Sequence, residues 1–221
     1  MKTQFIAHRG ASAVATENTL ESILAAKKAG AKMIEIDIRE TADGKFVLSH
    51  DATTQRIFNV NLSIHEHTLA ELQALCPNLL RLEDAIKTVK LTPLVIELKS
   101  HVNIPSLFKL FSKYPLLRYR IASFHAAPLK EIKKNYPSTF TYLLEHHSAY
   151  DAINRAKAIG ANGIGYNFSL INPLTYWLCR FNKLELYAYT VNNPINVWFL
   201  RKFYPRVAIC TDAPHKFVKK R

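Results

Sequence analysis

The 221-residue sequence lacks any long apolar run, and this absence limits where the chain can reside. No stretch approaches the roughly 20 consecutive apolar residues that a membrane-spanning helix needs. The amino terminus, MKTQFIAHRG, also lacks the apolar core of a secretion signal and reaches the polar pair His8 and Arg9 almost at once. We therefore expect no stable membrane insertion and a location in the cytoplasm.

Cysteine is scarce as well. The chain has three, an odd number, and they lack the close pairing that is typical of a zinc site. We interpret all three as small buried thiols: Cys76, Cys179 and Cys210.

Acidic residues are few relative to basic ones. Asp and Glu total 17 against 30 Lys and Arg, which gives a formal net charge of +13. Such a surplus favours anionic partners, whether nucleic acid, a membrane surface or a phosphorylated small molecule. A nucleic-acid partner is disfavoured because no groove-reading or base-stacking motif accompanies the charge. The closing KFVKKR is most simply a solvated basic tail, with a role at lipid or nucleic acid as the alternative.

Short apolar runs alternate with amphipathic helical stretches, a pattern that is typical of an α/β fold with a parallel sheet. Eight candidate strands fit a closed (β/α)8 TIM barrel better than an open sheet, so we predict one barrel domain over residues 1–221. The predicted strands are 4–8, 33–39, 93–99, 119–125, 139–145, 162–167, 184–190 and 207–211. After a first helix ending before residue 30, the predicted helices are 68–75, 82–89, 104–113, 128–135, 149–159, 172–181 and 194–203.

The first third of the chain predicts the ends of one helix and the position of one hairpin. Asn18 is expected to cap the first helix, with Glu21 three residues later, and Gly30 is expected to end it. Asp43-Gly44 predicts a turn that sends FVLSHD back along the second strand as a short hairpin. Because two helices then precede the third predicted strand, the segment of about 51–81 is expected to be an insertion over the barrel mouth.

Two strands carry alternating carboxylates. Side chains alternate across a strand, so Glu35 and Asp37 share one face of MIEIDIR, which would be the barrel interior, and the isoleucines share the other. VIELK repeats the pattern with Glu97 and Lys99. Three converging carboxylates without a nearby cysteine suit one hard divalent cation, Mg²⁺ or Ca²⁺. The alternative is a set of buried salt bridges in which Lys99 and Arg9 pair with the three carboxylates.

Two histidines are expected at the same rim. His8 and Arg9 end the first strand, and His50 ends the returning arm of the hairpin. Histidine exchanges protons near neutral pH, and the arginine fork suits phosphate oxygens. Gly10 is expected to let the backbone approach a ligand closely.

Taken together, these motifs resemble those of glycerophosphodiester phosphodiesterases. The similarity lies in HRGASAVATENT from His8, then IEIDI, LSHD and VIELK, followed by IASF, YTVNN and ICTDAP, in the expected order over nearly the whole chain. Three positions depart from the family pattern: the proline of the family's PENT is absent before Glu17, Tyr189 replaces a tryptophan, and Val207-Ala208 replace a glycine-containing approach to the last strand. These departures affect the loop after the first strand and the substrate preference.

The resemblance implies a barrel hydrolase of lipid and glycerol metabolism that releases sn-glycerol 3-phosphate and an alcohol from deacylated phospholipids. By the family's motif, Glu35, Asp37 and Glu97 would bind the metal, and the 51–81 insertion would help shape the glycerol end of the site. His8 and His50 would be the acid–base pair. Arg9 would hold the phosphate, and Lys99 would lie close to it.

Two other functions fit parts of the sequence. A lysophospholipase D or phosphoinositide phosphodiesterase on the same barrel would need an apolar lip, for which Phe58, Tyr187 and Tyr189 are candidates. A non-catalytic anion-binding protein would need no acidic metal cluster. The sequence does not decide the leaving alcohol, Mg²⁺ against Ca²⁺, the oligomeric state, or attack by water against a cyclic phosphate; it favours His50 only weakly as the acid.

Overall fold

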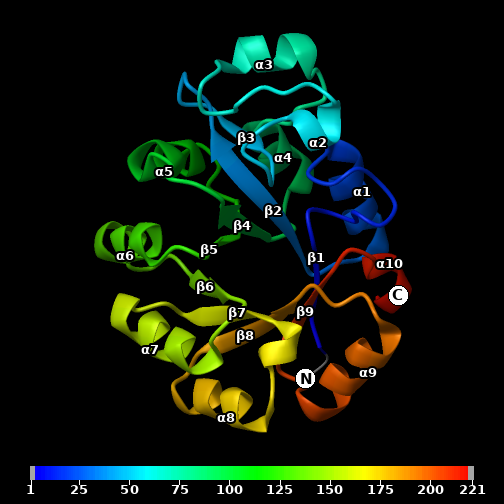
Figure 1. Cartoon of the computed structure of the whole chain (residues 1–221), viewed down its shortest axis with the longest axis vertical. Coiled ribbons are helices and arrows are strands. Elements are labelled where there is room, and N and C mark those ends of the chain that lie inside the picture. The colour runs from blue at the N-terminus through cyan, green and yellow to red at the C-terminus, as the bar shows by residue number, and fades with distance from the viewer. Residues whose placement is uncertain (1–2, 219–221) are drawn as a thin grey trace.

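The computed structural model describes residues 3–218, and eight parallel strands in it close into a barrel surrounded by helices (Figure 1). The sheet order is β1-β9-β8-β7-β6-β5-β4-β2-β3, and an additional pairing of β1 with β2 closes the ring. The predicted TIM barrel is confirmed, and every predicted strand overlaps an observed one. The parallel strands are β1 (Phe5–Ala7), β2 (Met33–Glu40), β4 (Leu94–Leu98), β5 (Tyr119–Ser123), β6 (Thr141–Glu145), β7 (Gly163–Asn167), β8 (Glu185–Tyr189) and β9 (Ala208–Thr211).

The helices that follow the strands also lie where the sequence places them. They are α1 (Leu20–Ala29), α3 (Leu69–Leu75), α4 (Leu82–Val89), α5 (Ile104–Ser112), α6 (Ala126–Asn135), α7 (Ala149–Ile159), α8 (Pro173–Phe181) and α9 (Pro194–Phe203). Three short elements were not predicted because each is a single turn: α2 (Gln55–Phe58), the 3₁₀ turn η1 (Phe168–Leu170) and α10 (Pro214–Phe217). Among the residues described, no helix has both the length and the apolar character needed to cross a bilayer.

The expected cap of α1 is wrong by one residue. Thr19 caps the helix, and it exchanges side-chain and backbone hydrogen bonds with Ser22 rather than Glu21. Asn18 instead adopts a left-handed backbone conformation, with φ of 57°, and turns its side chain toward the barrel. Gly30 ends the helix as expected, with φ of 80°. The difference matters because Asn18 is thereby free to contact the acidic residues of β2.

The hairpin after β2 is confirmed. β3 (Phe46–Leu48) pairs antiparallel with β2, and Glu40 lies opposite Phe46. The segment that follows, 51–81, carries α2 and α3 and packs around its own buried cluster. In Figure 1 this segment lies beside β3, on the side of the barrel away from α8 and α9. That cluster contains Val47, Ile64, Leu72, Cys76 and Leu79.

Two apolar layers support the barrel. The outer layer lies between strands and helices and includes all three isoleucines of β2 (Ile34, Ile36 and Ile38), as predicted. A smaller cluster fills the interior, where Tyr142 and Tyr187 meet edge to face. Gly163 and Gly165 make room for these rings, since an added Cβ at either position would lie within 2.7 Å of one of them. The filled interior leaves space for chemistry at the carboxyl ends of the strands.

The three cysteines are free and buried, as interpreted from the sequence. At the carboxyl terminus, Phe217 of α10 stacks on Phe5 with ring centroids 6.0 Å apart. The remainder of the basic tail, Lys219 to Arg221, lies outside the described residues, so its role stays a prediction.

Candidate active site

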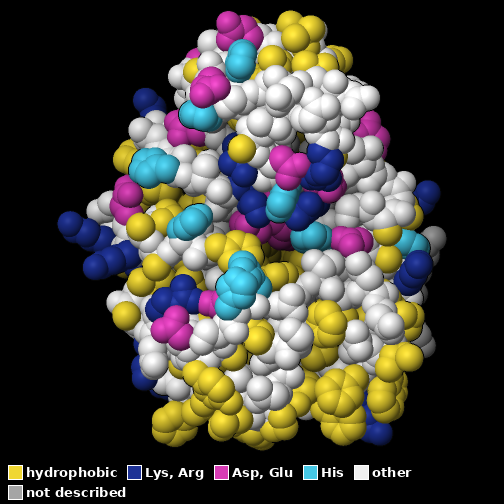
Figure 2. Space-filling model, viewed as in Figure 1, with side chains coloured by type: hydrophobic (Ala, Val, Ile, Leu, Met, Phe, Trp, Pro, Cys, Tyr) yellow, Lys and Arg dark blue, Asp and Glu magenta, His cyan; other side chains and the backbone are white. Residues whose placement is uncertain are grey.

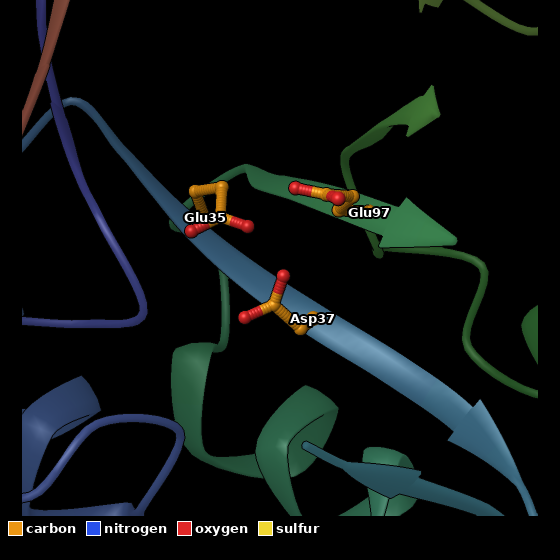
Figure 3. Close-up of side chains that lie close together, drawn as sticks. All are labelled: Glu35, Asp37 and Glu97. Carbon is orange, nitrogen blue, oxygen red and sulfur yellow. The ribbon is translucent and has the colours of Figure 1, made fainter. Parts of the chain in front are cut away.

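Three carboxylates from two adjacent strands converge inside the mouth of the barrel (Figure 3). Asp37 of β2 is in register with Glu97 of β4, and Glu35 lies two residues earlier on the same face of β2. One ligand oxygen of each residue lies within 4.8 Å of the other two. At an effective dielectric constant of about 20, each ionised pair at this separation repels by at least about 3 kcal/mol. The cluster therefore requires a positive charge or a proton among its oxygens.

Basic side chains neutralise the three carboxylates only in part. Lys99 donates to Glu97 Oε1 at 2.7 Å and lies 3.8 Å from Asp37 Oδ1. Arg9 Nε lies 3.1 Å from Asp37 Oδ2. Within residues 3–218, however, Glu35 Oε1 and Asp37 Oδ1 are buried and accept no hydrogen bond. Buried salt bridges alone thus leave two oxygens unsatisfied, whereas a divalent cation would satisfy both.

The pKa values of the cluster reflect the same deficit of positive charge. Burial, followed by repulsion from Asp37 and Glu97, raises the pKa of Glu35 well above its ordinary value. Burial and then the charge of Asp37 raise the pKa of Glu97 to about 7, although Lys99 opposes the shift. Groups held this far from their ordinary protonation are typical of functional sites. The three residues could hold a metal ion.

Asn18 is a site residue that the sequence reasoning assigned to a helix cap. Its Nδ2 donates to Asp37 Oδ2 at 2.9 Å, and its Oδ1 accepts from the backbone N–H of Asp37 at 3.1 Å. This two-point contact fixes the carboxylate of Asp37 through Oδ2 and leaves Oδ1 without a hydrogen bond among the described residues. Asn18 stands immediately before the capping threonine, so its residue type and position fit both a helix cap and a contact with Asp37. The sequence alone did not distinguish these two roles.

His8 follows β1 and is oriented by Asp212, which follows β9. The two residues contact through His8 Nδ1 and Asp212 Oδ1 at 2.6 Å, while Ser12 Oγ also donates to Asp212 Oδ1 at 2.9 Å. Burial would raise the pKa of Asp212, but the hydrogen bond and charge of His8 outweigh it and the pKa falls to about 2. An ionised Asp212 therefore binds one ring nitrogen of His8 and leaves the other for a substrate. Asp212 belongs to the ICTDAP motif, but no role was assigned to it from the sequence.

His50 likewise has an aspartate partner, Asp51, at its Nδ1. Its Nδ1 lies 2.7 Å from Asp51 Oδ1, and Arg39 donates twice to its backbone carbonyl, at 2.7 and 3.2 Å. Burial lowers the pKa of His50, although the hydrogen bond to Asp51 opposes the shift. Arg39 was not predicted as a site residue, since its place at the end of β2 resembles that of any exposed strand-end arginine.

An ion-pair network links the two histidine-bearing loops. Arg56 of α2 contacts Asp51 at 2.5 Å and Glu17 at 2.7 Å, and Glu17 also accepts from Arg9 Nη1 at 3.0 Å. Arg9 itself has a left-handed backbone, with φ of 53°, and its N–H donates to Glu35 Oε2 at 2.8 Å. The segment 51–81 thus reaches the active-site rim through Arg56.

Gly10 makes a close contact that the sequence did not predict, and its expected approach to a ligand stays a prediction. Its φ is 83°, and an added Cβ would lie 2.3 Å from Ser22 Oγ and 2.6 Å from the Ser22 backbone. The close approach at this glycine is therefore to α1.

A cavity of about 320 Å³ opens over the cluster. Its lining brings together six of the seven residues predicted from the sequence, and the seventh, Asp37, lies directly beneath in contact with Lys99. Figure 2 shows the charged and histidine side chains gathered around this hollow near the centre of the face. Of the three candidate lip residues, Tyr187 and Tyr189 line this cavity. Phe58 packs beside the buried cluster of segment 51–81 and lines a smaller pocket with Glu17 and His50. The six predicted lining residues are His8, Arg9, Glu35, His50, Glu97 and Lys99.

A larger cavity, of about 450 Å³, lies at the amino-terminal ends of the strands. Its charged lining consists of Arg120, Arg180, Glu185 and Arg206. This lining contains one carboxylate and no histidine, so it lacks the combination found at the other end.

Known proteins resemble this chain over almost its whole length. The profile of the Glycerophosphoryl diester phosphodiesterase family matches residues 8–216. A Bacillus subtilis (strain 168) protein provisionally named as a glycerophosphodiester phosphodiesterase is 31% identical over 208 residues, 85% of this chain and 86% of that protein. The glycerophosphodiester phosphodiesterase of Caldanaerobacter subterraneus subsp. tengcongensis is 28% identical over 212 residues, 87% of each chain.

Among solved structures, an Oleispira antarctica phosphodiesterase in complex with the product sn-glycerol 3-phosphate has a TM-score of 0.87 to this chain at 24% identity. The similarity covers 97% of this chain and 95% of that one, and it shows that the two share a fold. On the profile match over residues 8–216 and the 31% identical relative, the chain belongs to the glycerophosphoryl diester phosphodiesterase family and is a phosphoric diester hydrolase.

Proposed function

We propose that this enzyme hydrolyses glycerophosphodiesters to sn-glycerol 3-phosphate and an alcohol in a divalent-metal-dependent reaction. The observation that carries the proposal is the pair of unsatisfied oxygens, Glu35 Oε1 and Asp37 Oδ1, beside a cavity that both His8 and His50 line. The product found in the Oleispira antarctica phosphodiesterase supports the choice of substrate class.

The donor set favours a hard cation. Glu35, Asp37 and Glu97 offer carboxylate oxygens, which suit Mg²⁺ or Ca²⁺ better than a thiophilic metal. When bound, such an ion would polarise the phosphoryl group and neutralise charge that develops on its oxygens. Asn18 holds Asp37 in place for this task by its two hydrogen bonds.

Arg9 and Lys99 would bind the phosphodiester. Both line the cavity, and both already lie against the acidic cluster through Asp37. Their positive charges would stabilise the transition state, where negative charge on the phosphoryl oxygens increases. In the metal-free site, separate ion pairs hold Arg9 against Glu17 and Lys99 against Glu97.

The two histidines would divide the proton transfers. Burial lowers the pKa of His50, which favours the neutral form that accepts a proton from the attacking hydroxyl. Asp212 contacts His8 Nδ1 and would leave the other ring nitrogen to donate a proton to the departing alcohol. We therefore assign the base to His50 and the acid to His8, which reverses the weak preference drawn from the sequence.

Three further expectations stay predictions: the cytoplasmic location, the single-domain organisation of residues 1–221, and the part of segment 51–81 in shaping the glycerol end of the site.

The proposed function is tested by measuring glycerol 3-phosphate released from glycerophosphocholine with Mg²⁺, with Ca²⁺ and with chelator. We expect turnover with at least one ion and its loss on chelation, restored by adding that ion back. Lysophosphatidylcholine serves as the comparison substrate and should be hydrolysed more slowly. Full activity in chelator would contradict metal dependence, and faster turnover of the lysolipid would favour the lysophospholipase D alternative.

In the same assay, Glu35→Gln and Asp37→Asn should each lower activity by at least about a hundredfold, because each removes a charged ligand of the cation. Glu131→Gln is the matched control, since it neutralises an exposed carboxylate on α6 far from the cavity. Normal turnover by either site variant at ordinary metal concentrations would remove the carboxylates from the mechanism.

The histidine roles are separated by the leaving group. His50→Ala and His8→Ala should each lower turnover of glycerophosphocholine by about 10²–10⁴-fold, while His125→Ala, an exposed histidine, should not. A 4-nitrophenyl phosphodiester needs no acid to protonate its leaving group, so it should rescue His8→Ala and leave His50→Ala inactive. Rescue of His50→Ala instead would exchange the two assignments. Circular dichroism checks that each variant remains folded.

Metal binding should depend on pH. Folding raises the pKa of Glu97 to about 7 when no metal is bound. At pH values between the ordinary pKa of a glutamate and about 7, this carboxyl is therefore more protonated in the folded chain than in the unfolded chain. Stability from this group therefore falls as pH rises through that window, and a cation that replaces the proton removes the loss. Mg²⁺ should raise Tm more at about pH 8 than at about pH 5.5. Equal increments at both values, or an unchanged difference in Glu97→Gln, would contradict this linkage.

A further inference from the structure

Helices α8 and α9 present apolar side chains to solvent as well as to the core. On α9, Ile195, Trp198, Phe199 and Phe203 are between 44% and 71% exposed, and their spacing of three and four residues places them on one outward stripe. α8 has a similar stripe, whose Phe181 is 86% exposed. We call these side chains the flank patch; it comprises Leu174, Trp177, Phe181, Ile195, Trp198, Phe199 and Phe203.

The two stripes form one surface. Aromatic contacts run from Trp177 to Tyr176, then to Tyr204, Phe199 and Phe203, with ring centroids 4.8 to 5.9 Å apart. The buried Tyr176 and Tyr204 thus connect α8 with α9 beneath the exposed rings. Figure 2 shows the apolar side chains gathered along the lower edge of the molecule, where Figure 1 places α8 and α9. Contiguous apolar surface of this kind usually marks an interaction site.

The charged residues of the segment that carries the patch are mostly basic. Residues 171–206 contain five basic residues and a single acidic one, Glu185, which pairs with Arg120. Lys202 lies over two patch rings, with Nζ 4.8 Å from the centre of Trp198 and 5.3 Å from that of Phe203. The basic residues are Arg180, Lys183, Arg201, Lys202 and Arg206.

This combination identifies the occupant. Two copies of the chain meeting at this face would bring together like charges, on molecules that each carry +13. Tryptophan and phenylalanine beside lysine and arginine are instead the residues that anchor proteins at the boundary between anionic headgroups and acyl chains. A basic chain supplies the long-range attraction, and the exposed rings supply the buried apolar area.

We propose that the flank patch docks the enzyme reversibly on the surface of an anionic phospholipid bilayer. The patch rings lie in the interface, while Lys202 and Arg201 contact headgroup phosphates. Docking differs from insertion, because each helix has ten residues or fewer and keeps its other face in the barrel core. In Figure 2 the charged hollow lies at the centre of the face and the patch at its edge, so docking leaves the cavity accessible to a water-soluble substrate.

The test uses the two tryptophans of the chain, Trp177 and Trp198, both of which belong to the patch. The full-length enzyme is mixed with equimolar phosphatidylglycerol–phosphatidylcholine vesicles, and co-sedimentation and tryptophan emission are recorded. We expect binding to these vesicles with an emission shift to shorter wavelength and quenching by lipids brominated on their acyl chains. Binding should weaken with salt and with pure phosphatidylcholine.

Matched variants locate the contact. Phe181→Ser/Phe203→Ser keeps both reporters and should weaken partitioning by at least about tenfold, whereas Leu75→Ser/Leu116→Ser, which alters exposed leucines elsewhere, should not. Arg201→Gln/Lys202→Gln should weaken binding more than Lys130→Gln/Lys134→Gln on α6, which removes the same charge. All four should hydrolyse glycerophosphocholine at the wild-type rate.

Three outcomes would overturn the proposal. They are failure of the wild-type enzyme to bind anionic vesicles at low salt, binding without a change in tryptophan emission, and sedimentation of a stable dimer that the phenylalanine variant dissociates. The last would assign the patch to a second copy of the chain.

Discussion

Three carboxylates held within 4.8 Å of one another in a buried site repel strongly, and the barrel must keep them together against that repulsion. β2 and β4 do so by register, since Asp37 lies opposite Glu97 and the isoleucines between the acids pack against the helices. Asn18 holds Asp37 from the loop before α1, and the Arg9 backbone holds Glu35. The scaffold thus holds three carboxylates together at a place where a divalent cation could bind.

The rest of the site is arranged around this charge. His8 and His50 stand on different loops, and each has one ring nitrogen beside an aspartate, Asp212 or Asp51. Arg56 and Glu17 connect the loop of His50 with that of Arg9, so that the segment after the hairpin and the loop after β1 keep a fixed spacing. Orientation of this kind would suit the proton transfers proposed for the two histidines, because a displaced imidazole transfers its proton poorly.

Eight apolar runs that alternate with helical stretches predicted the barrel, and the alternation of side chains within two strands predicted that Glu35, Asp37 and Glu97 face its interior. Contacts between distant loops were not predictable in this way. Asp212 lies 204 residues from His8, and no local pattern indicates that pairing. Asn18 and Thr19 are both good helix caps by residue type, so only the three-dimensional position of Asp37 decides which of them caps α1. The sequence did not predict the outward aromatic stripes of α8 and α9, because both faces of these helices are apolar and the pattern does not show which face is exposed.

The central claim is that one divalent cation lies among the three carboxylates, and anomalous diffraction from crystals soaked in Mn²⁺ tests it most directly. The account predicts a single strong peak within bonding distance of Glu35 Oε1, Asp37 Oδ1 and a carboxylate oxygen of Glu97, with Lys99 displaced toward the cavity. A Mn²⁺-soaked crystal with no peak at this position, and with Lys99 still bound to Glu97, would contradict it.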